Sequence, residues 1–184
     1  RWRQRRVVDL QARLRKFERQ DLPDLLRWAT DIEQLGAYVQ AEDHNLSDWQ
    51  ERFDKTNLLG PEEWFYLYER ADGAKLGYAH FWRCDRYEDH LEFGRVLDKE
   101  YRNKGLGLDF LRQIIDLIFE SQNCFRVQAI TAADNEIVQK QWRQAGITSE
   151  GRLRSFMTVR ERKLDCAIGS ILRSEWQEMK SKVI

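Results

Sequence analysis

The stretch that decides the fold is residues 100–107, which read Glu-Tyr-Arg-Asn-Lys-Gly-Leu-Gly. An apolar run ends just before it at Leu97, and apolar residues at helical spacing follow it, so the sequence predicts a strand, a glycine-bearing loop and a helix. The free N–H groups at the start of such a helix attract phosphate, and glycine lets the main chain approach a ligand closely. Arg102 and Lys104 add positive charge, so we expect a pyrophosphate to bind at this loop.

Two better-known phosphate motifs do not match this stretch. A dinucleotide-binding fingerprint requires a third glycine three residues after Gly107, where Phe110 stands. A P-loop requires Ser or Thr directly after a Gly-Lys pair, and the chain has none here. The sequence therefore argues against both nucleotide-binding classes.

Apolar periodicity on either side of the loop predicts an α/β chain. Strands are expected at residues 14–17, 64–69, 76–82, 90–97, 125–130, 152–159 and 164–172. Helices are expected after Asp21 as an N-cap, after Ser47 and Gln50 as a capping box, after Gly105, and from Asn135 to Gly146. Asp72-Gly73 is a hairpin signal between two of the strands. We expect a mixed, mostly antiparallel twisted sheet of about seven strands with about four flanking helices.

The chain contains neither a linker nor a repeat, so we expect one domain over residues 1–184, with a core at about 12–172 and a short C-terminal helical tail.

Lys and Arg together number 31, as do Asp and Glu, which argues against a nucleic-acid or membrane partner. The Arg-rich residues 1–6 are interpreted as a solvated terminus. Three widely spaced cysteines indicate neither a disulfide framework nor a zinc site, so we expect a reducing, cytoplasmic setting and no metal.

Arg102, Gly105 and Gly107 match, position by position, the Arg/Gln-x-x-Gly-x-Gly/Ala signature of the GNAT N-acetyltransferases. The resemblance extends over nearly the whole chain. Five further segments resemble the branch that includes ribosomal-protein alanine acetyltransferases: residues 25–28, Asn135, Ala145-Gly146, residues 150–154 and residues 172–176.

The resemblance implies a fold whose fourth and fifth strands splay apart, and acetyl-CoA as the cosubstrate. Pantetheine would lie along Val96 and Leu97, and the Leu97 N–H would stabilise the oxyanion as an amine attacks the thioester directly. The residues implied in coenzyme binding are Val96, Leu97, Arg102, Asn103, Lys104, Gly105, Leu106, Gly107 and Asn135.

Two positions depart from the family pattern. Many members carry a Tyr general acid seven residues after the motif Asn, and here that place is Trp142. A coenzyme A thiol with a pKa near the roughly 8.5 of cysteine leaves fairly well, so water could protonate it. Ile147 replaces a Phe that often follows the Ala-Gly pair, which is a conservative apolar change.

Candidate catalytic and acceptor residues each have a structural alternative. Glu92 would act as a general base through water, or would only pair with Arg95 or Arg126. Asn135 would contact pantetheine, or would only cap its helix. Four further residues are expected to border the acceptor, although each could be structural or merely solvated: Asp43, His44, His80 and Trp82.

The function expected from these residues is transfer of an acetyl group from acetyl-CoA to a primary amine of a small molecule, such as an amino sugar, aminoglycoside, polyamine or amino acid. A protein N-terminus, including that of a ribosomal protein, is the alternative acceptor. A non-catalytic acyl-CoA-binding module is the alternative from another class, and a homodimer is left open.

Overall fold

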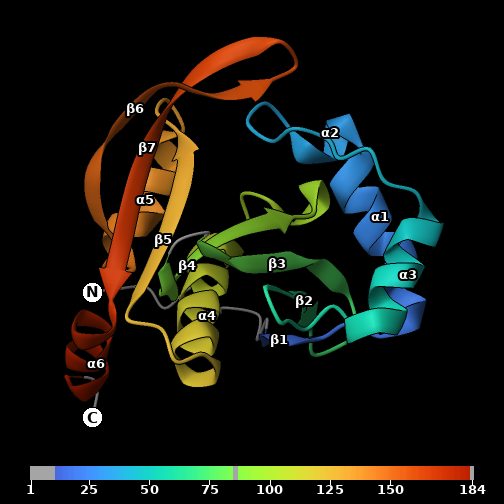
Figure 1. Cartoon of the computed structure of the whole chain (residues 1–184), viewed down its shortest axis with the longest axis horizontal. Coiled ribbons are helices and arrows are strands. Elements are labelled where there is room, and N and C mark those ends of the chain that lie inside the picture. The colour runs from blue at the N-terminus through green and yellow to red at the C-terminus, as the bar shows by residue number, and fades with distance from the viewer. Residues whose placement is uncertain (1–10, 85–86, 183–184) are drawn as a thin grey trace, which may run out of the picture.

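The computed structural model describes residues 11–84 and 87–182 of the chain. Its centre is one seven-stranded sheet with the strand order β1-β2-β3-β4-β5-β7-β6 (Figure 1). The strands are β1 (Ala12–Lys16), β2 (Glu63–Arg70), β3 (Lys75–Cys84), β4 (Tyr87–Leu97), β5 (Arg126–Ala132), β6 (Thr148–Val159) and β7 (Arg162–Leu172). Neighbouring strands are antiparallel except β4 and β5, which are parallel. The predicted mixed α/β sheet is confirmed. The Arg-rich residues 1–6 lie outside the described residues.

Helices cover both faces of this sheet (Figure 1). Helix α4 packs its apolar side against one face in the larger core cluster, while α1 and α3 cover the other face in a second cluster. The described residues contain six α-helices: four flanking helices as expected, the expected helical tail as α6, and α2 as a further short turn. The helices are α1 (Leu22–Thr30), α2 (Ile32–Leu35), α3 (Leu46–Thr56), α4 (Leu106–Ser121), α5 (Glu136–Gln144) and α6 (Arg173–Ser181).

One predicted helix start and one predicted capping role need correction. Helix α3 is capped by Asn45 and Asp48, which exchange reciprocal side-chain to main-chain bonds, and Ser47 already lies inside the helix. Asn caps as well as Ser does, and Leu46 starts the apolar side of the helix, so the start moves forward. Asp21 occupies the N-cap of α1, but its buried carboxylate bonds Arg15 instead of capping the helix.

Both glycine-based signals are confirmed. Asp72-Gly73 joins β2 to β3, and Gly73 has φ +85°, a conformation that glycine adopts at no steric cost. Gly146 follows α5 with the same φ of +85°.

Strands β4 and β5 pair over only a short length. The parallel register joins residues 90–92 to residues 126–128, and no pair of described residues extends it beyond Glu92. We call the stretch beyond this point, residues 93–97 of β4 facing residues 129–132 of β5, the β4–β5 opening. It is the splay that the sequence resemblance implied.

The β6–β7 hairpin reaches over the sheet toward α2 (Figure 1). Arg160, at the hairpin tip, donates to the main-chain oxygens of Ile32 and Gly36 at 2.9 and 2.7 Å. The Arg160 N–H also donates to the Gln40 side chain at 2.9 Å. These bonds fix the hairpin tip against the segment between α1 and α3. Among the described residues, no helix is both long and apolar enough to cross a membrane.

Candidate active site

The loop after β4 has the geometry that the motif predicted. A 3-10 turn, η2 (Lys99–Tyr101), is followed by Asn103 with φ +59° and Gly105 with φ +83°. Gly105 is the N-cap of the 16-residue helix α4. Because the first N–H groups of a helix have no partner within it, the start of α4 is suited to an anion.

Arg102 bonds to main-chain oxygens beside this loop. Its guanidinium donates through Nε to the Leu97 main-chain oxygen at 2.9 Å, and through Nη2 to the main-chain oxygen of Gln34. Burial lowers the pKa of Arg102. Two of its guanidinium nitrogens are therefore occupied by main-chain carbonyls, and the expectation that Arg102 adds positive charge for a pyrophosphate stays a prediction.

Lys104 is an exposed cation of the loop. Its Nζ lies 5.3 Å from the centroid of the Tyr101 ring, and no salt bridge of Lys104 is found among the described residues. A cavity of about 940 Å³ opens beside it, lined among others by Arg13, Lys104, Gly105 and Leu106. An anion approaching the start of α4 would meet Lys104 before Arg102.

Gly107 brings α4 and α5 close together. A Cβ added at Gly107 would lie 2.6 Å from Gln141 Nε2, on α5. Arg95 fills the same junction, because it donates to the Gly107 main-chain oxygen and to Gln141 Oε1. The second motif glycine therefore allows helix packing, in addition to any approach of a ligand.

The β4–β5 opening presents main-chain groups of alternate β4 residues. The Asp98 N–H donates to the Leu76 oxygen at 2.8 Å, and Leu97 is registered against Gly77. In an antiparallel pair, hydrogen-bonded and non-bonded residues alternate, so Arg95 and Leu97 direct their N–H and C=O away from β3 and into the opening. Val96 pairs with Tyr78 on β3, and its main chain is turned away from the opening.

The proposed acceptor residues share one face of β3. His80 stacks on Phe65 with ring centroids 3.9 Å apart and lies 4.7 Å from the Trp82 ring. His80 Nε2 lies 3.1 Å from Glu63 Oε2, and Arg52 also bonds Glu63. Hydrogen bonding to His80 and to Arg52 lowers the pKa of Glu63 to about 2. His80 and Trp82 thus form an aromatic wall with a carboxylate at its edge that is charged at neutral pH.

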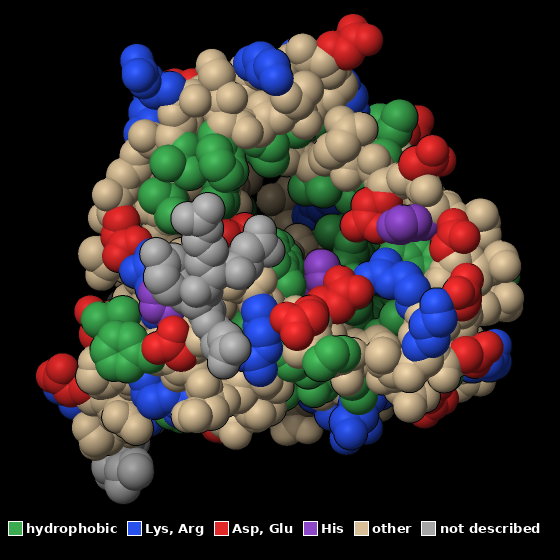
Figure 2. Space-filling view, in the orientation of Figure 1, with side chains coloured by type: hydrophobic (Ala, Val, Ile, Leu, Met, Phe, Trp, Pro, Cys, Tyr) green, Lys and Arg blue, Asp and Glu red, His purple; other side chains and the backbone are tan. Residues whose placement is uncertain are grey.

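Asp43 and His44 lie in the exposed loop between α2 and α3. His44 Nε2 is 3.4 Å from Glu42 Oε2, and the His44 ring meets Trp49 edge-on at 5.4 Å. Figure 2 shows that the viewed face is hollowed at its centre, with acidic and histidine side chains along part of the margin. Trp49 also meets Phe65 at 5.4 Å, so His44 is linked to the aromatic wall through Trp49.

Glu92 stands opposite Trp82 in the register of β3 and β4. Its carboxylate accepts a hydrogen bond from Gln128 Nε2 at 2.8 Å, and burial raises its pKa. Arg126 bonds Glu150 and Ser170 instead, and Arg95 bonds the α4–α5 junction. The alternative in which Glu92 pairs with Arg95 or Arg126 is therefore wrong.

Asn135 caps α5. Its side-chain oxygen accepts from the Val138 N–H at 3.5 Å, and its Nδ2 donates to Thr131 Oγ1 at 3.1 Å. The capping role is confirmed, and a contact with pantetheine stays a prediction.

Comparison with known proteins agrees with this geometry. Residues 11–148 match the family model described as an acetyltransferase (GNAT) domain. This chain belongs to the GNAT acetyltransferases. It is an acyl-CoA-dependent acetyltransferase that uses acetyl-CoA. Within the described residues, no group of three or more His, Cys, Asp or Glu side chains could hold a metal ion.

The relatives within the GNAT family are distant. An uncharacterized N-acetyltransferase p20 of Bacillus licheniformis is 23% identical over 89% of this chain and 93% of its own length. A spermidine N(1)-acetyltransferase of Escherichia coli K12 is 22% identical over 77% of this chain and 75% of its own length. The crystal structure of a spermidine N-acetyltransferase from Vibrio cholerae in complex with CoA and spermine has a TM-score of 0.79 at 19% identity, covering 91% of this chain and 98% of that one. That likeness supports the GNAT fold. The resemblance to the ribosomal-protein branch stays a prediction.

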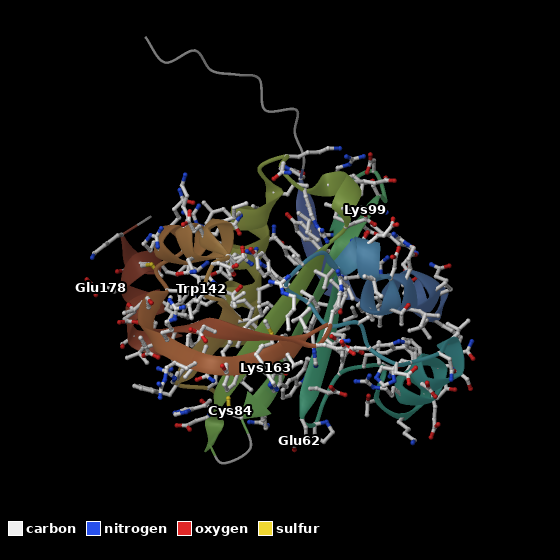
Figure 3. The ribbon with its side chains drawn as sticks, turned by 90° about the horizontal axis from the view of Figure 1, so that it is seen from above. Glu62, Cys84, Lys99, Trp142, Lys163 and Glu178 are labelled. Carbon is white, nitrogen blue, oxygen red and sulfur yellow. The ribbon has the colours of Figure 1, made fainter. Side chains whose placement is uncertain are left out.

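Trp142, at the place of the usual GNAT tyrosine, is a core residue. Its side chain is 3% exposed, and a Cβ added at Gly169 on β7 would lie 3.0 Å from its ring. In Figure 3, Trp142 lies well apart from Lys99, which marks the loop after β4. Trp142 therefore packs α5 against the sheet.

Sequence reasoning missed two buried polar residues beside the loop. Gln34 is 0% exposed and Asp98 is 4% exposed. Asp98 accepts hydrogen bonds from Arg27 and from Trp28 Nε1, both at 2.8 Å, and so joins α1 to the end of β4. Asp98 could have been noticed as a carboxylate directly after an apolar strand, whereas Gln34 carries no such signal.

Proposed function

We propose that this chain is a cytoplasmic enzyme that transfers an acetyl group from acetyl-CoA to a primary amine of a small molecule, with polyamines as the first acceptors to test. The observation that carries the proposal is the β4–β5 opening, where the main chain of Arg95 and the N–H of Leu97 face away from β3 and have no β5 partner, directly beside the glycine loop. Glu92 is on the same strand, at the point where the strands separate.

An extended ligand can bind in the opening in the same way as an additional β-strand would. The N–H and C=O groups of Arg95 and the N–H of Leu97 supply the hydrogen bonds, while the start of α4 and Lys104 bind the phosphates. The Leu97 N–H is the donor that stabilises the charge developing on the thioester oxygen. A donor held by the sheet needs no reorganisation during the reaction, which is the main source of its catalytic effect.

Glu92 is the residue that helps to remove a proton from the acceptor. An alkyl amine with a pKa of about 10.4 is mostly protonated at neutral pH and cannot attack until it loses a proton. Burial raises the pKa of Glu92, which makes it a stronger base than an ordinary carboxylate. Glu92 is five residues before Leu97 on a strand with a rise of roughly 3.3 Å per residue, so a water chain must relay the proton.

The leaving thiolate needs no side-chain acid in this proposal. Trp142 is buried in the core and has no acidic proton to give. A thiol pKa near the roughly 8.5 of cysteine allows the thiolate to leave and take a proton from water.

Polyamines are supported by the names of the relatives and by the carboxylates of the acceptor face. Two of the proteins compared are spermidine acetyltransferases. The chain places Glu63 beside His80, and Glu42 beside His44, around the aromatic wall. Ammonium groups spaced along a flexible chain would pair with such separated carboxylates. The other acceptors expected from the sequence are included in the same test.

The test is release of free thiol from acetyl-CoA with a panel of acceptors: spermidine, spermine, glucosamine, an aminoglycoside, free amino acids and a peptide with a free N-terminus. We expect turnover with small amines and the highest kcat/KM with polyamines. Turnover only with the peptide would make the chain a protein N-terminal acetyltransferase. Acetyl-CoA binding in calorimetry without turnover on any acceptor would make it a non-catalytic acyl-CoA-binding module.

A further inference from the structure

The main-chain oxygen of Leu97 is held by two side chains from different parts of the molecule. Arg102 Nε donates to it at 2.9 Å, and Gln34 Nε2 donates to it at 3.4 Å. The two residues also bind each other, because Arg102 Nη2 donates to the main-chain oxygen of Gln34. We call Gln34, Arg102 and the Leu97 carbonyl the Leu97 clamp.

Gln34 extends the clamp beyond Leu97. Its Oε1 accepts from the Lys99 N–H at 3.3 Å, so one amide bonds the main chain on both sides of Asp98. Gln34 is completely buried on a four-residue helix, 63 residues away from Leu97 in the sequence. A buried amide with bonded ends is costly to disturb, since any displaced donor or acceptor would lack a partner.

Gly36 allows the clamp to close. Its φ of +76° turns the chain directly after α2, and a Cβ added there would lie 3.4 Å from Arg102 Nη1. The guanidinium thus passes beside a residue without a side chain before it reaches Gln34. The same segment bonds Arg160 through the oxygens of Ile32 and Gly36, so the clamp is supported by the β6–β7 hairpin.

We infer that Gln34 and Arg102 are positioning residues that fix the Leu97 main chain in the β4–β5 opening, so that its N–H points at the reacting thioester oxygen. The inference rests on the proposed function, in which that N–H is the oxyanion donor. Leu97 is the last residue of β4 and has no β5 partner, so the sheet alone does not hold it on both sides. The clamp supplies the missing restraint from the carbonyl side.

Two consequences distinguish this role from coenzyme binding. Loss of the clamp should lower kcat with little change in the KM for acetyl-CoA, because the phosphates are bound by the start of α4 and Lys104. A displacement of about 1 Å at a reacting group can cost roughly a hundredfold in rate. Substitution of Lys104 should have the opposite effect and raise the KM for acetyl-CoA.

The experiment compares Gln34→Met and Arg102→Met with Gln113→Met and Lys104→Met. Gln113 is a matched control, since its amide also bridges two main-chain groups: it donates to the Ala12 oxygen at 2.8 Å and accepts from the Leu14 N–H at 3.2 Å. The measurements are kcat, the KM for acetyl-CoA, Tm, and the NMR shift of the Leu97 carbonyl carbon in coenzyme-free protein. We expect both clamp variants to lose about a hundredfold in kcat and to shift the Leu97 resonance. Gln113→Met should lower Tm and leave kcat and the Leu97 resonance unchanged.

Gln34→Glu is the second variant, in case Gln34→Met does not fold. A carboxylate keeps the acceptor for Lys99 but cannot donate to Leu97, whereas a protonated carboxyl can. The kcat of Gln34→Glu relative to the wild-type protein should therefore recover as pH falls. A merely structural role would produce no such recovery.

The clamp inference is overturned if Gln34→Met and Gln113→Met lose kcat to the same extent, or if the Leu97 resonance does not move in either clamp variant. Failure of the proposed function looks different. In that case the wild-type protein shows no turnover. The shift of the Leu97 carbonyl resonance in the clamp variants then decides by itself whether the clamp restrains the Leu97 main chain.

Discussion

Glu92 accepts a hydrogen bond from Gln128 across the last registered pair of β4 and β5, at a distance of 2.8 Å. Beyond this pair the two strands separate. The carboxylate thus lies at the mouth of the opening, where an amine can approach a thioester, and an uncharged amide holds it. Burial raises the pKa of Glu92 by more than the hydrogen bond from Gln128 lowers it, whereas an ion pair with an arginine would have lowered it further.

The first prediction concerns the basicity of Glu92. Glu92→Gln keeps the shape of the side chain and removes the base, so kcat/KM at pH 7 should fall by roughly a hundredfold. Much of the loss should be recovered at high pH, because free amine accumulates there. Acetyl-CoA affinity in calorimetry should not change. An equal loss at every pH, or no loss, would exclude a role for Glu92 as the base.

The second prediction concerns stability. Burial raises the pKa of Glu92, so the folded protein holds this proton more tightly than the unfolded chain does. The stabilisation is complete below the unfolded pKa and is lost as pH rises through the folded pKa. Glu92→Gln does not titrate, so its Tm relative to wild type should rise as pH increases above the ordinary Glu pKa of about 4.3. A difference in Tm that is independent of pH would contradict the burial of a titrating carboxyl.

Glu63 should show the opposite pH dependence. Its pKa is lowered to about 2 by its bonds to His80 and Arg52, so its contribution is present above the ordinary Glu pKa and is lost as pH falls toward 2. Its side chain is 41% exposed, so screening limits the effect to below about 1 kcal/mol. The difference in urea unfolding between Glu63→Gln and wild type should be present at pH 7 and should shrink as pH falls toward about 2. Equal differences at both values would show that the carboxylate is not engaged.

Gly105 and Gly73 provide a matched pair for the coenzyme loop. Their φ angles are +83° and +85°, and a Cβ at either position would meet no atom within 4 Å. Alanine at each should cost a similar ~1–2 kcal/mol of folding free energy from the left-handed backbone. Only Gly105→Ala should weaken acetyl-CoA binding in calorimetry, and Gly105→Val should abolish it with the fold retained. If Gly105→Val bound like wild type, the site would be misplaced.

Trp142→Phe tests the absence of a side-chain acid. Because Trp142 is 3% exposed in the core, the smaller ring should lower the free energy of unfolding by about 1–3 kcal/mol through the cavity that it leaves. Turnover should stay within a few-fold of wild type. A drop of more than about a hundredfold in kcat, with coenzyme binding intact, would assign Trp142 a direct part in the reaction.

The sequence by itself determined the strand–loop–helix unit at residues 100–107, the alternation of strands and helices, and the family. These features depend on local physics: Gly105 must adopt a positive φ, apolar residues repeat with the period of their element, and Asp72-Gly73 favours a tight hairpin. The pairing of Val96 with β3 and the α3 cap at Asn45 were not anticipated, because strand phase and exact helix ends depend on neighbours.

Only the tertiary structure decided the partners of the charged and polar residues. Arg102 looked like a phosphate ligand in the motif, but it binds Leu97 and a glutamine 68 residues away in the sequence. Arg95 is close to Glu92 in the sequence and Arg126 is on the neighbouring strand β5, yet Glu92 binds Gln128. Long side chains can reach many partners, and the choice depends on which main-chain carbonyls and amides the folded chain leaves unsatisfied nearby. That information exists only once α2, β4 and β5 have been brought together.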